Sequence, residues 1–428
     1  MEHRNITNMR FGRGRALMAI IILATGLTLT VADTDQARAQ GAVRSWGMGG
    51  TGVANTRGLE AVDFNPANLA FSKGFSLGLA AAAVDVHNNA ISLDRYNEIT
   101  GAHLSTADKE QLLGDIPADG FKLDADMRAS ALGLQVGSFA VTFGAAGAGS
   151  GNLDKDYFDL VLFGNQLGET VDFSSTSGEG YAVGQAAFSY GGVLHTGETT
   201  RFSYGLSAKY LQGIYEMHVE DAYGSMSTSM EEIGGEAFVS TLSSEGGSGW
   251  GMDLGFALQT SGGWSVGASV ENLYSTMQWD TNVEANEFRV TAGDINALND
   301  DMEGSIVDSD TTFAAGSYSS SLPAKLRMGA SNRFGPLMVA LDYTQGFENR
   351  GITSTTPSFH LGGELWSGSM FQPRFGLSTG GVSGTGASAG LGLRLGFWKI
   401  DLAVLSRGEL NPNKTKGLAF AAGSSLEF

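Results

Sequence analysis

The chain has 428 residues and a formal net charge of −19, and it contains no cysteine. The acidic balance argues against nucleic acid as a partner and against docking on anionic lipid through a basic patch. Disulfide bonds and cysteine-based metal sites are excluded because no cysteine is present. The 62 glycines against 7 prolines favour many short strands and turns over a helical bundle.

The amino-terminal segment has the pattern of a secretory signal peptide. Several arginines precede an apolar stretch at 16–32, which is followed by Ala37-Arg38-Ala39. A basic region, an apolar region and a small-residue cleavage site appear in that order in signal peptides. We therefore expect residues 1–39 to be removed. The alternative is a membrane anchor, which the threonines within the apolar stretch disfavour.

A glycine-rich segment follows at 44–70. The residues on which we expect its tight turns to depend are Gly47, Gly49, Gly50, Gly52, Asn65, Pro66 and Ala67. Glycine tolerates the backbone of a crowded turn, whereas proline fixes one backbone angle and asparagine favours turns. The stretch 47–52 also matches the glycine pattern of dinucleotide-binding sites. No strand precedes it, so we expect no nucleotide there.

From Gly74 onward, apolar and polar residues alternate in segments of about ten residues, the length of a tilted strand in a membrane. The segments predict fourteen strands: 74–86, 127–136, 138–148, 180–192, 200–214, 248–260, 264–275, 320–333, 337–347, 356–367, 370–380, 385–396, 398–407 and 416–428. No segment after the leader reaches the ~18 consecutive apolar residues of a spanning helix. If the chain crosses a membrane, we expect it to do so as a closed barrel, because lipid cannot satisfy open strand edges.

The charged positions of these strands share one face. With the apolar face toward lipid, the lumen receives Asp253, Glu271, Lys325, Arg327, Asp342, Glu364, Arg374, Arg394, Lys399 and Asp401. We expect these charges to form ion pairs that hold a plug, because unpaired charges beside a plug are costly. The alternative is a hydrated pore whose charges tune ion selectivity.

The connections distinguish a transmembrane barrel from a soluble β-sandwich, which has the same period with its faces reversed. Tight turns, as at Gly137 and 334–336, alternate with connections that are tens of residues long in the first half of the barrel. Short turns on one rim and long loops on the other are typical of periplasmic and extracellular ends. We therefore predict an all-β fold at 74–428, a transmembrane antiparallel β-barrel of about fourteen strands.

The long connections carry acidic and helical segments. The segments 215–247 and 276–319 are strongly acidic, and we expect them to be solvated loops. Calcium binding at Asp308-Ser-Asp310 is an alternative, although no full EF-hand spacing is present. Capping and glycine signals predict short helices at 105–114 and 157–163.

The last strand ends in Phe428. A terminal aromatic residue after an alternating strand resembles the assembly signal of bacterial outer-membrane barrels. The stretch 386–390 matches the G-x-S-x-G pattern of hydrolases, but Ser388 falls inside a predicted strand and no histidine follows His360. We expect no catalytic residue, metal or cofactor, and an outer-membrane lipase with another triad order is the remaining enzymatic alternative.

The segment 44–70 also carries a family resemblance. Its glycine-rich start, Asp63 and Asn65-Pro66-Ala67 just before the first strand resemble the FadL/TodX family of hydrophobic-compound transporters and the related PorV-type barrels. The resemblance implies a bacterial outer-membrane barrel with the predicted strand count, plugged by an N-terminal hatch at 40–73. It also implies passive uptake of a hydrophobic small molecule, with outer-membrane lipid and the barrel-assembly machinery as partners.

In that family the ligand leaves sideways where a strand kinks. Glycine weakens strand pairing, and Gly144, Gly147 and Gly149 lie close together in the third strand. We therefore expect the lateral opening there. The alternative function is a PorV-like barrel that does not transport but acts as a docking or secretion partner for a surface protein.

Overall fold

The computed structural model describes residues 39–428 except 165, 230–232 and 296–305. The expected signal peptide lies outside the described residues apart from Ala39. Among the helices in the described part of the chain, none combines the length and apolar character needed to cross a membrane.

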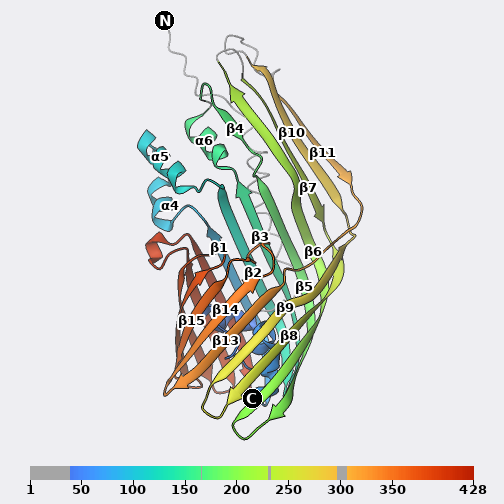
Figure 1. Cartoon of the computed structure of the whole chain (residues 1–428), viewed down its shortest axis with the longest axis vertical. Coiled ribbons are helices and arrows are strands. Elements are labelled where there is room, and N and C mark those ends of the chain that lie inside the picture. Colours follow the sequence, from blue (N-terminus) through green and yellow to red (C-terminus); the bar gives the residue numbers. More distant parts are fainter. Residues whose placement is uncertain (1–38, 165, 230–232, 296–305) are drawn as a thin grey trace. The chain divides into compact units, whose positions relative to one another are not determined.

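Fourteen antiparallel strands form a closed ring, which Figure 1 shows from the side. In order around the ring they are β1 (Phe75–Asn88), β2 (Phe121–Val136), β3 (Phe139–Leu153), β5 (Ser177–Thr196), β6 (Thr200–Thr228), β8 (Gly247–Thr260), β9 (Ser265–Trp279), β13 (Lys325–Phe334), β14 (Leu337–Gly346), β15 (Ser358–Leu365), β16 (Phe371–Gly380), β17 (Gly386–Leu395), β18 (Trp398–Arg407) and β19 (Gly417–Glu427). The ring closes where β1 pairs with β19. The alternation of the sequence therefore predicted the fold class and the strand count correctly.

Alternation sorts the side chains between the two faces of the wall. In β14, Leu341 points outward and is 55% exposed, whereas its neighbour Asp342 points into the lumen and is 2% exposed. The same separation holds in β16, where Phe375 points outward and Arg374 inward. The outer wall is thus apolar and the interior polar, as required of a barrel in lipid.

The short turns lie on one rim. Gly137 and Gly335 adopt positive φ angles of 56° and 61° in the turns after β2 and β13, a conformation that glycine adopts without steric cost. Phe428 lies on this rim, where its ring stacks on Phe397 at a centroid distance of 5.2 Å and contacts Phe75 at 5.6 Å. Phe428 therefore belongs to an aromatic cluster on this rim.

The two acidic segments are not simply loops, and the expectation that they would be was wrong. They contain β7 (Ile233–Ser244), β10 (Glu284–Ile295), β11 (Ile306–Ala314) and β12 (Tyr318–Ser320), while β4 (Thr170–Asp172) precedes β5. From Glu216 onward β6 pairs with β7 instead of β8. The pairing order β4–β6–β7–β10–β11 forms a sheet that continues past the ring, and we call it the outer sheet. β-branched residues between the acids favour these strands, and pairing with the end of β6 completes the sheet.

Short helices occur in three other connections. Those after β1 and β3 contain α4 (Leu93–Ile99), α5 (Thr106–Asp115) and α6 (Lys155–Phe163), and η3 (Pro412–Lys414) precedes β19. The Ser105 hydroxyl accepts a hydrogen bond from the Asp108 amide, and the Asp108 carboxylate accepts one from the Ser105 amide. This capping box explains why α5 begins where the sequence predicted. The second predicted helix is α6.

Candidate functional site

The barrel encloses a compact segment, residues 39–72, which we call the lumen segment. It contains α2 (Gln40–Gly47), α3 (Glu60–Phe64) and η2 (Pro66–Phe71), drawn in blue among the barrel strands in Figure 1. The helix α2 packs against β1 and β16–β19, and η2 packs against β5, β6 and β8. A Cβ atom at Gly205 would collide with the backbone of Pro66 and Ala67. The barrel wall therefore makes room for η2 by using glycine.

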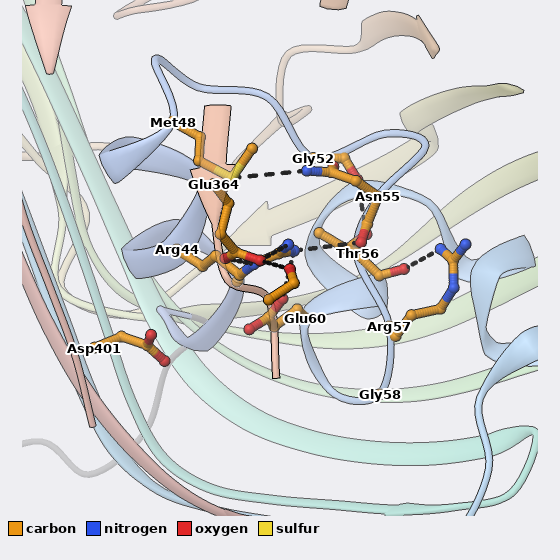
Figure 2. A network of polar contacts seen from close by, with 12 residues as sticks. Arg44, Met48, Gly52, Asn55, Thr56, Arg57, Gly58, Glu60, Glu364 and Asp401 are labelled. Carbon is orange, nitrogen blue, oxygen red and sulfur yellow. Dashed lines mark hydrogen bonds and ion pairs between the residues drawn. The ribbon is translucent and has the colours of Figure 1, made fainter. Parts of the chain in front are cut away.

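Arg44 joins the lumen segment to the wall (Figure 2). Its Nε and Nη2 atoms donate to the two carboxylate oxygens of Glu364 at 2.8 and 3.1 Å. Its Nη1 atom donates to Glu60 at 3.3 Å and to the carbonyl oxygen of Asn55 at 3.3 Å. The guanidinium thus binds two carboxylates in a buried site, where a two-pronged geometry offsets part of the cost of desolvation.

Wall residues complete this network. Arg374 donates to Glu364 at 2.7 Å and to Asp401 at 2.6 Å, and Lys399 donates to Glu60 at 2.6 Å. We call the six side chains the ion network: Arg44, Glu60, Glu364, Arg374, Lys399 and Asp401. Three cations balance three carboxylates, so the lumen can bury them without an excess charge.

The sequence interpretation placed Glu364, Arg374 and Asp401 in the lumen, and the structure brings them together. It did not single out Arg44 or Glu60. A signal was available, because both are charged residues within a segment expected to be a buried plug. A buried charge requires a partner of opposite sign.

The predicted turn residues bind the wall through backbone atoms. The Asp342 carboxylate accepts hydrogen bonds from the amides of Gly52 and Val53 at 2.6 and 2.9 Å. Gly49 donates its amide to the Ser388 hydroxyl at 2.8 Å, and its carbonyl accepts from the His360 ring at 2.7 Å. Ser388, in the apparent hydrolase pattern, is therefore an acceptor for the lumen segment.

The sequence Asn65-Pro66-Ala67 begins η2. The Asn65 side chain accepts from the Ala67 amide at 3.1 Å and donates to the carbonyl oxygens of Phe256 and Val53. Pro66 occupies the first turn, where its missing amide hydrogen costs nothing. Gly49 and Gly50 have φ angles of 70° and 100°, whereas Gly47 lies against Gly390 of β17.

The other predicted lumen charges form separate groups. Glu271 pairs with Arg327 at 2.8 Å and with Lys325 at 3.6 Å, and Arg327 also donates to the carbonyl oxygen of Asp63. Asp253 pairs with Lys209 across β6 and β8. Arg394 pairs with Glu427 at 3.3 Å, and both side chains are about one third exposed. The lumen therefore contains several local groups, of which only some reach the lumen segment.

Besides the ion pairs, the lumen contains a small cavity next to the lumen segment and a packed cluster of apolar side chains. A cavity of about 160 Å³ is lined by Ser45 and Phe64 together with charged side chains that include Arg128, Lys325 and Arg407. Elsewhere Val183, Leu211, Met277 and Trp279 form a buried cluster with Tyr181, Tyr318 and Leu322, and we call these seven residues the apolar cluster. This cavity therefore has many charged and polar side chains in its lining, whereas the apolar cluster is closely packed.

The wall is irregular at β9. The partner of Met252 is Tyr274 but the partner of Leu254 is Val270, so β9 bulges between them. At the bulge Asn272 has a φ of 51°, a conformation that few residues other than glycine and asparagine adopt.

The backbone pairing of β9 with its other neighbours, β13 and β12, is interrupted near Asn272. Pairing with β13 ends at Glu271–Lys325 and resumes with β12 at Met277–Ser320. The residues between, 321–324, include Pro323, which has no amide hydrogen to donate. We call this interruption the wall break.

Side chains bridge the wall break. Asn272 donates its amide to Asp253 at 2.8 Å and its side chain to the carbonyl oxygen of Pro323 at 3.1 Å. Lys209 donates to the Asn272 side chain at 2.8 Å. Ser275 accepts from the Leu322 amide at 2.8 Å. Side-chain bonds thus replace the missing backbone ladder over this stretch.

The predicted opening at β3 is not present in the structure. Throughout its described length, β3 pairs with β5 in one unbroken register from Phe139–Tyr190 to Asn152–Ser177. Its only irregularity is a bulge of β2 opposite Gly144. Three glycines did not open the ladder, because strand hydrogen bonds join backbone atoms and do not require side chains.

The acids considered for calcium, Asp308 and Asp310, lie on one face of β11. Among the described residues, no group of three or more histidine or acidic side chains has a geometry that would hold a metal ion.

Comparison with known proteins identifies a family and a fold. The model of a family described as "Family of unknown function (DUF5723)" matches residues 66–237 and 228–406. No curated protein matches the chain. A TodX mutant described as a monoaromatic hydrocarbon channel is 13% identical, with a TM-score of 0.50 over 90% of this chain and 98% of that one.

Two further solved structures are similar. A Pseudomonas aeruginosa FadL homologue is 12% identical over 92% of this chain and 99% of that one, with a TM-score of 0.48. The Ralstonia pickettii toluene transporter TbuX is 16% identical over 90% and 97% of the two chains, with a TM-score of 0.47. At these identities the TodX comparison shows a shared fold.

Proposed function

Because the chain belongs to the family of unknown function DUF5723 and has the FadL/TodX-type fold, we propose that it is a bacterial outer-membrane channel for passive uptake of small hydrophobic molecules. The lumen segment acts as its hatch, and the ion network holds the hatch in the barrel. Phe428 serves in assembly by the outer-membrane machinery, and lipid surrounds the apolar wall.

The observation that supports this function is the position of the apolar cluster beside the wall break. Leu322 belongs to the cluster and also follows the β12 strand into the interrupted ladder. Ser275, which binds the Leu322 backbone, lies two residues from Met277 of the cluster. An apolar molecule that displaces the cluster would therefore meet a stretch of wall where side chains replace backbone pairing.

The polar cavity is a poor route for such a molecule. Filling it with an apolar ligand would strip water from charged groups such as Arg128 and Lys325 without new hydrogen bonds, which is costly. The outer wall offers the opposite environment. A groove of about 500 Å³, lined by Leu258, Val266 and Met328, runs over β8, β9 and β13. A route from the apolar cluster to this groove begins and ends in apolar surroundings, and between them it crosses the polar side chains that bridge the wall break.

A reversible disulfide tests this route. The chain contains no cysteine, so Ser275→Cys with Leu322→Cys introduces a single possible bond across the wall break. The matched control is Gly144→Cys with Gln185→Cys, a facing pair between β3 and β5. Uptake of a labelled monoaromatic hydrocarbon and of a labelled fatty acid is measured in cells that produce each oxidised or reduced variant.

We expect oxidation to abolish uptake in the wall-break variant and reduction to restore it, while the β3 variant is unaffected. Unchanged uptake by the oxidised wall-break variant would exclude this exit. If oxidation blocked uptake only in the β3 variant, the lateral opening would lie at the glycines of β3 instead.

A further inference from the structure

The outer sheet ends in an unpaired strand. On one side β11 pairs with β10 from Ala292–Ile306 to Glu284–Ala314. Within the described part of the chain, β10 is the only strand whose register includes β11, and β12 pairs with β9. Every residue from Val307 to Ala314 is exposed. A long exposed edge offers a row of backbone donors and acceptors to an added strand.

The two faces of β11 differ in chemistry. Asp308 and Asp310 point to one face, whereas Val307 and Phe313, which are 61% and 45% exposed, point to the other. Strand alternation sets this separation. An added strand would therefore meet two carboxylates, Asp308 and Asp310, on one face and apolar or hydroxyl side chains on the other.

The neighbouring strands do not neutralise these carboxylates. Arg289 is the only lysine or arginine in β7, β10 and β11. Its guanidinium already pairs with Glu236 and packs over the ring of Phe238. Asp308 and Asp310 lie instead across from Val290 and Phe288. The edge therefore presents two carboxylates that have no cation among the side chains of these strands.

This charge pattern argues against a second copy of the chain as the added strand. An antiparallel pair of β11 strands centred on Ser309 would place Asp308 of each copy opposite Asp310 of the other. Like charges directly opposite one another destabilise a strand pair. Lysine or arginine at the same positions would instead gain favourable cross-strand pairs.

We propose that the β11 edge binds an extended basic segment of a partner protein by antiparallel strand addition. The segment has lysine or arginine at alternate positions, facing Asp308 and Asp310, and β-branched or apolar residues between them, facing Val307 and Phe313. This interaction is independent of transport, because β11 lies in the outer sheet and contributes no residue to the apolar cluster or the wall break.

The test uses the full-length protein in lipid nanodiscs and three synthetic peptides about as long as β11. One peptide alternates lysine with valine or threonine, the second replaces lysine by glutamate, and the third is the lysine peptide with N-methylated backbone amides. Binding is measured by titration, and hydrogen exchange reports protection of the β11 amides. N-methylation retains the charge but removes the strand hydrogen bonds.

The protein variant Asp308→Lys/Asp310→Lys is compared with Glu220→Lys/Asp221→Lys, which makes the same charge change in β6 of the outer sheet. We expect the lysine peptide to protect the β11 amides of the unmodified protein from exchange. The β11 variant should bind the lysine peptide about tenfold more weakly and should bind the glutamate peptide instead. The β6 variant should bind as the unmodified protein does.

Three results would overturn the proposal. The first is equal binding of the N-methylated peptide, and the second is equal loss in the two variants, since both would indicate general attraction to an acidic surface. The third is binding without protection of the β11 amides.

Discussion

Arg44 and Glu364 are 320 residues apart in the chain, yet they form a two-pronged hydrogen bond with donor–acceptor distances of 2.8 and 3.1 Å. This bond connects α2 of the lumen segment to β15 of the wall. Glu364 also accepts from Arg374 at 2.7 Å, so one carboxylate joins the lumen segment, β15 and β16. Buried ion pairs therefore contribute to the retention of the lumen segment, together with its backbone hydrogen bonds to Asp342 and Ser388.

Replacing Arg44 by glutamine should loosen the lumen segment. Loss of one partner from a buried ion pair costs about 3–5 kcal/mol, and we expect the lower end because Glu364 keeps Arg374 and Glu60 keeps Lys399. Hydrogen exchange in α2 should accelerate, and planar bilayers should show open-channel events that the unmodified protein lacks. Arg394→Gln, which removes a partly exposed pair with Glu427, should leave both readouts unchanged. A stable open channel in the unmodified protein would contradict the plugged barrel.

Substitutions of Asp342 should rank by the hydrogen bonds that they preserve. Asp342→Ala leaves the amides of Gly52 and Val53 without an acceptor, at a cost of about 1–3 kcal/mol for each buried donor. Asp342→Asn keeps one side-chain oxygen as an acceptor and should cost less. Exchange of these two amides should therefore be fastest in the alanine variant and intermediate in the asparagine variant. Indistinguishable rates in all three proteins would show that Asp342 does not hold this turn.

Adding a methyl group at Gly213 should disturb the apolar cluster. A Cβ atom there would collide with the ring of Trp279 and lie 3.0 Å from the Gly247 nitrogen, and overpacking of this kind costs about 1–3 kcal/mol. We expect Gly213→Ala to lower the thermal unfolding midpoint and to raise exchange near Trp279. Gly151→Ala is the matched control, because a Cβ atom there would meet no atom within 4 Å. Equal midpoints for the two variants would argue against close packing around Trp279.

The outer sheet should respond to pH through His218. Its hydrogen bond to Glu216 raises the pKa of the imidazole above the ordinary value of 6.5. The folded sheet therefore favours the protonated ring, so its stabilising contribution is present below about pH 6.5 and is lost as pH rises through the raised pKa. Protection of the β6 and β7 amides, corrected for intrinsic exchange, should fall as the pH rises above about 6.5. His218→Gln should remove this pH dependence. If amide protection fell equally in that variant, the pH dependence would belong to another group.

Several features of the fold could be predicted from local patterns. The strand count and the helix at Ser105 follow from alternation and capping, which depend on residues close together in the chain. Alternation also assigned Glu364, Arg374 and Asp401 to one face. It could not pair them, because the period gives the face of a strand but not the level at which its neighbour lies.

The acidic segments show where local patterns were insufficient. Their charge suggested loops, but cross-strand pairing with the end of β6 made them strands, since strand stability depends on neighbours more than on intrinsic preference. The wall break was missed for the same reason. Asn272 and Pro323 are 51 residues apart, and neither stands out until β9 and β13 are adjacent.

The order of residues is therefore sufficient to establish an antiparallel barrel with a polar lumen, a glycine-rich segment before its first strand, and long acidic connections on one rim. These features arise from a two-residue period and from turn chemistry, which act over a few residues. Closure of the ring decides which lumen charges meet Arg44, where the wall is interrupted, and which strand is left with a free edge. Those outcomes depend on register between distant segments, and register is set only when all strands pair at once.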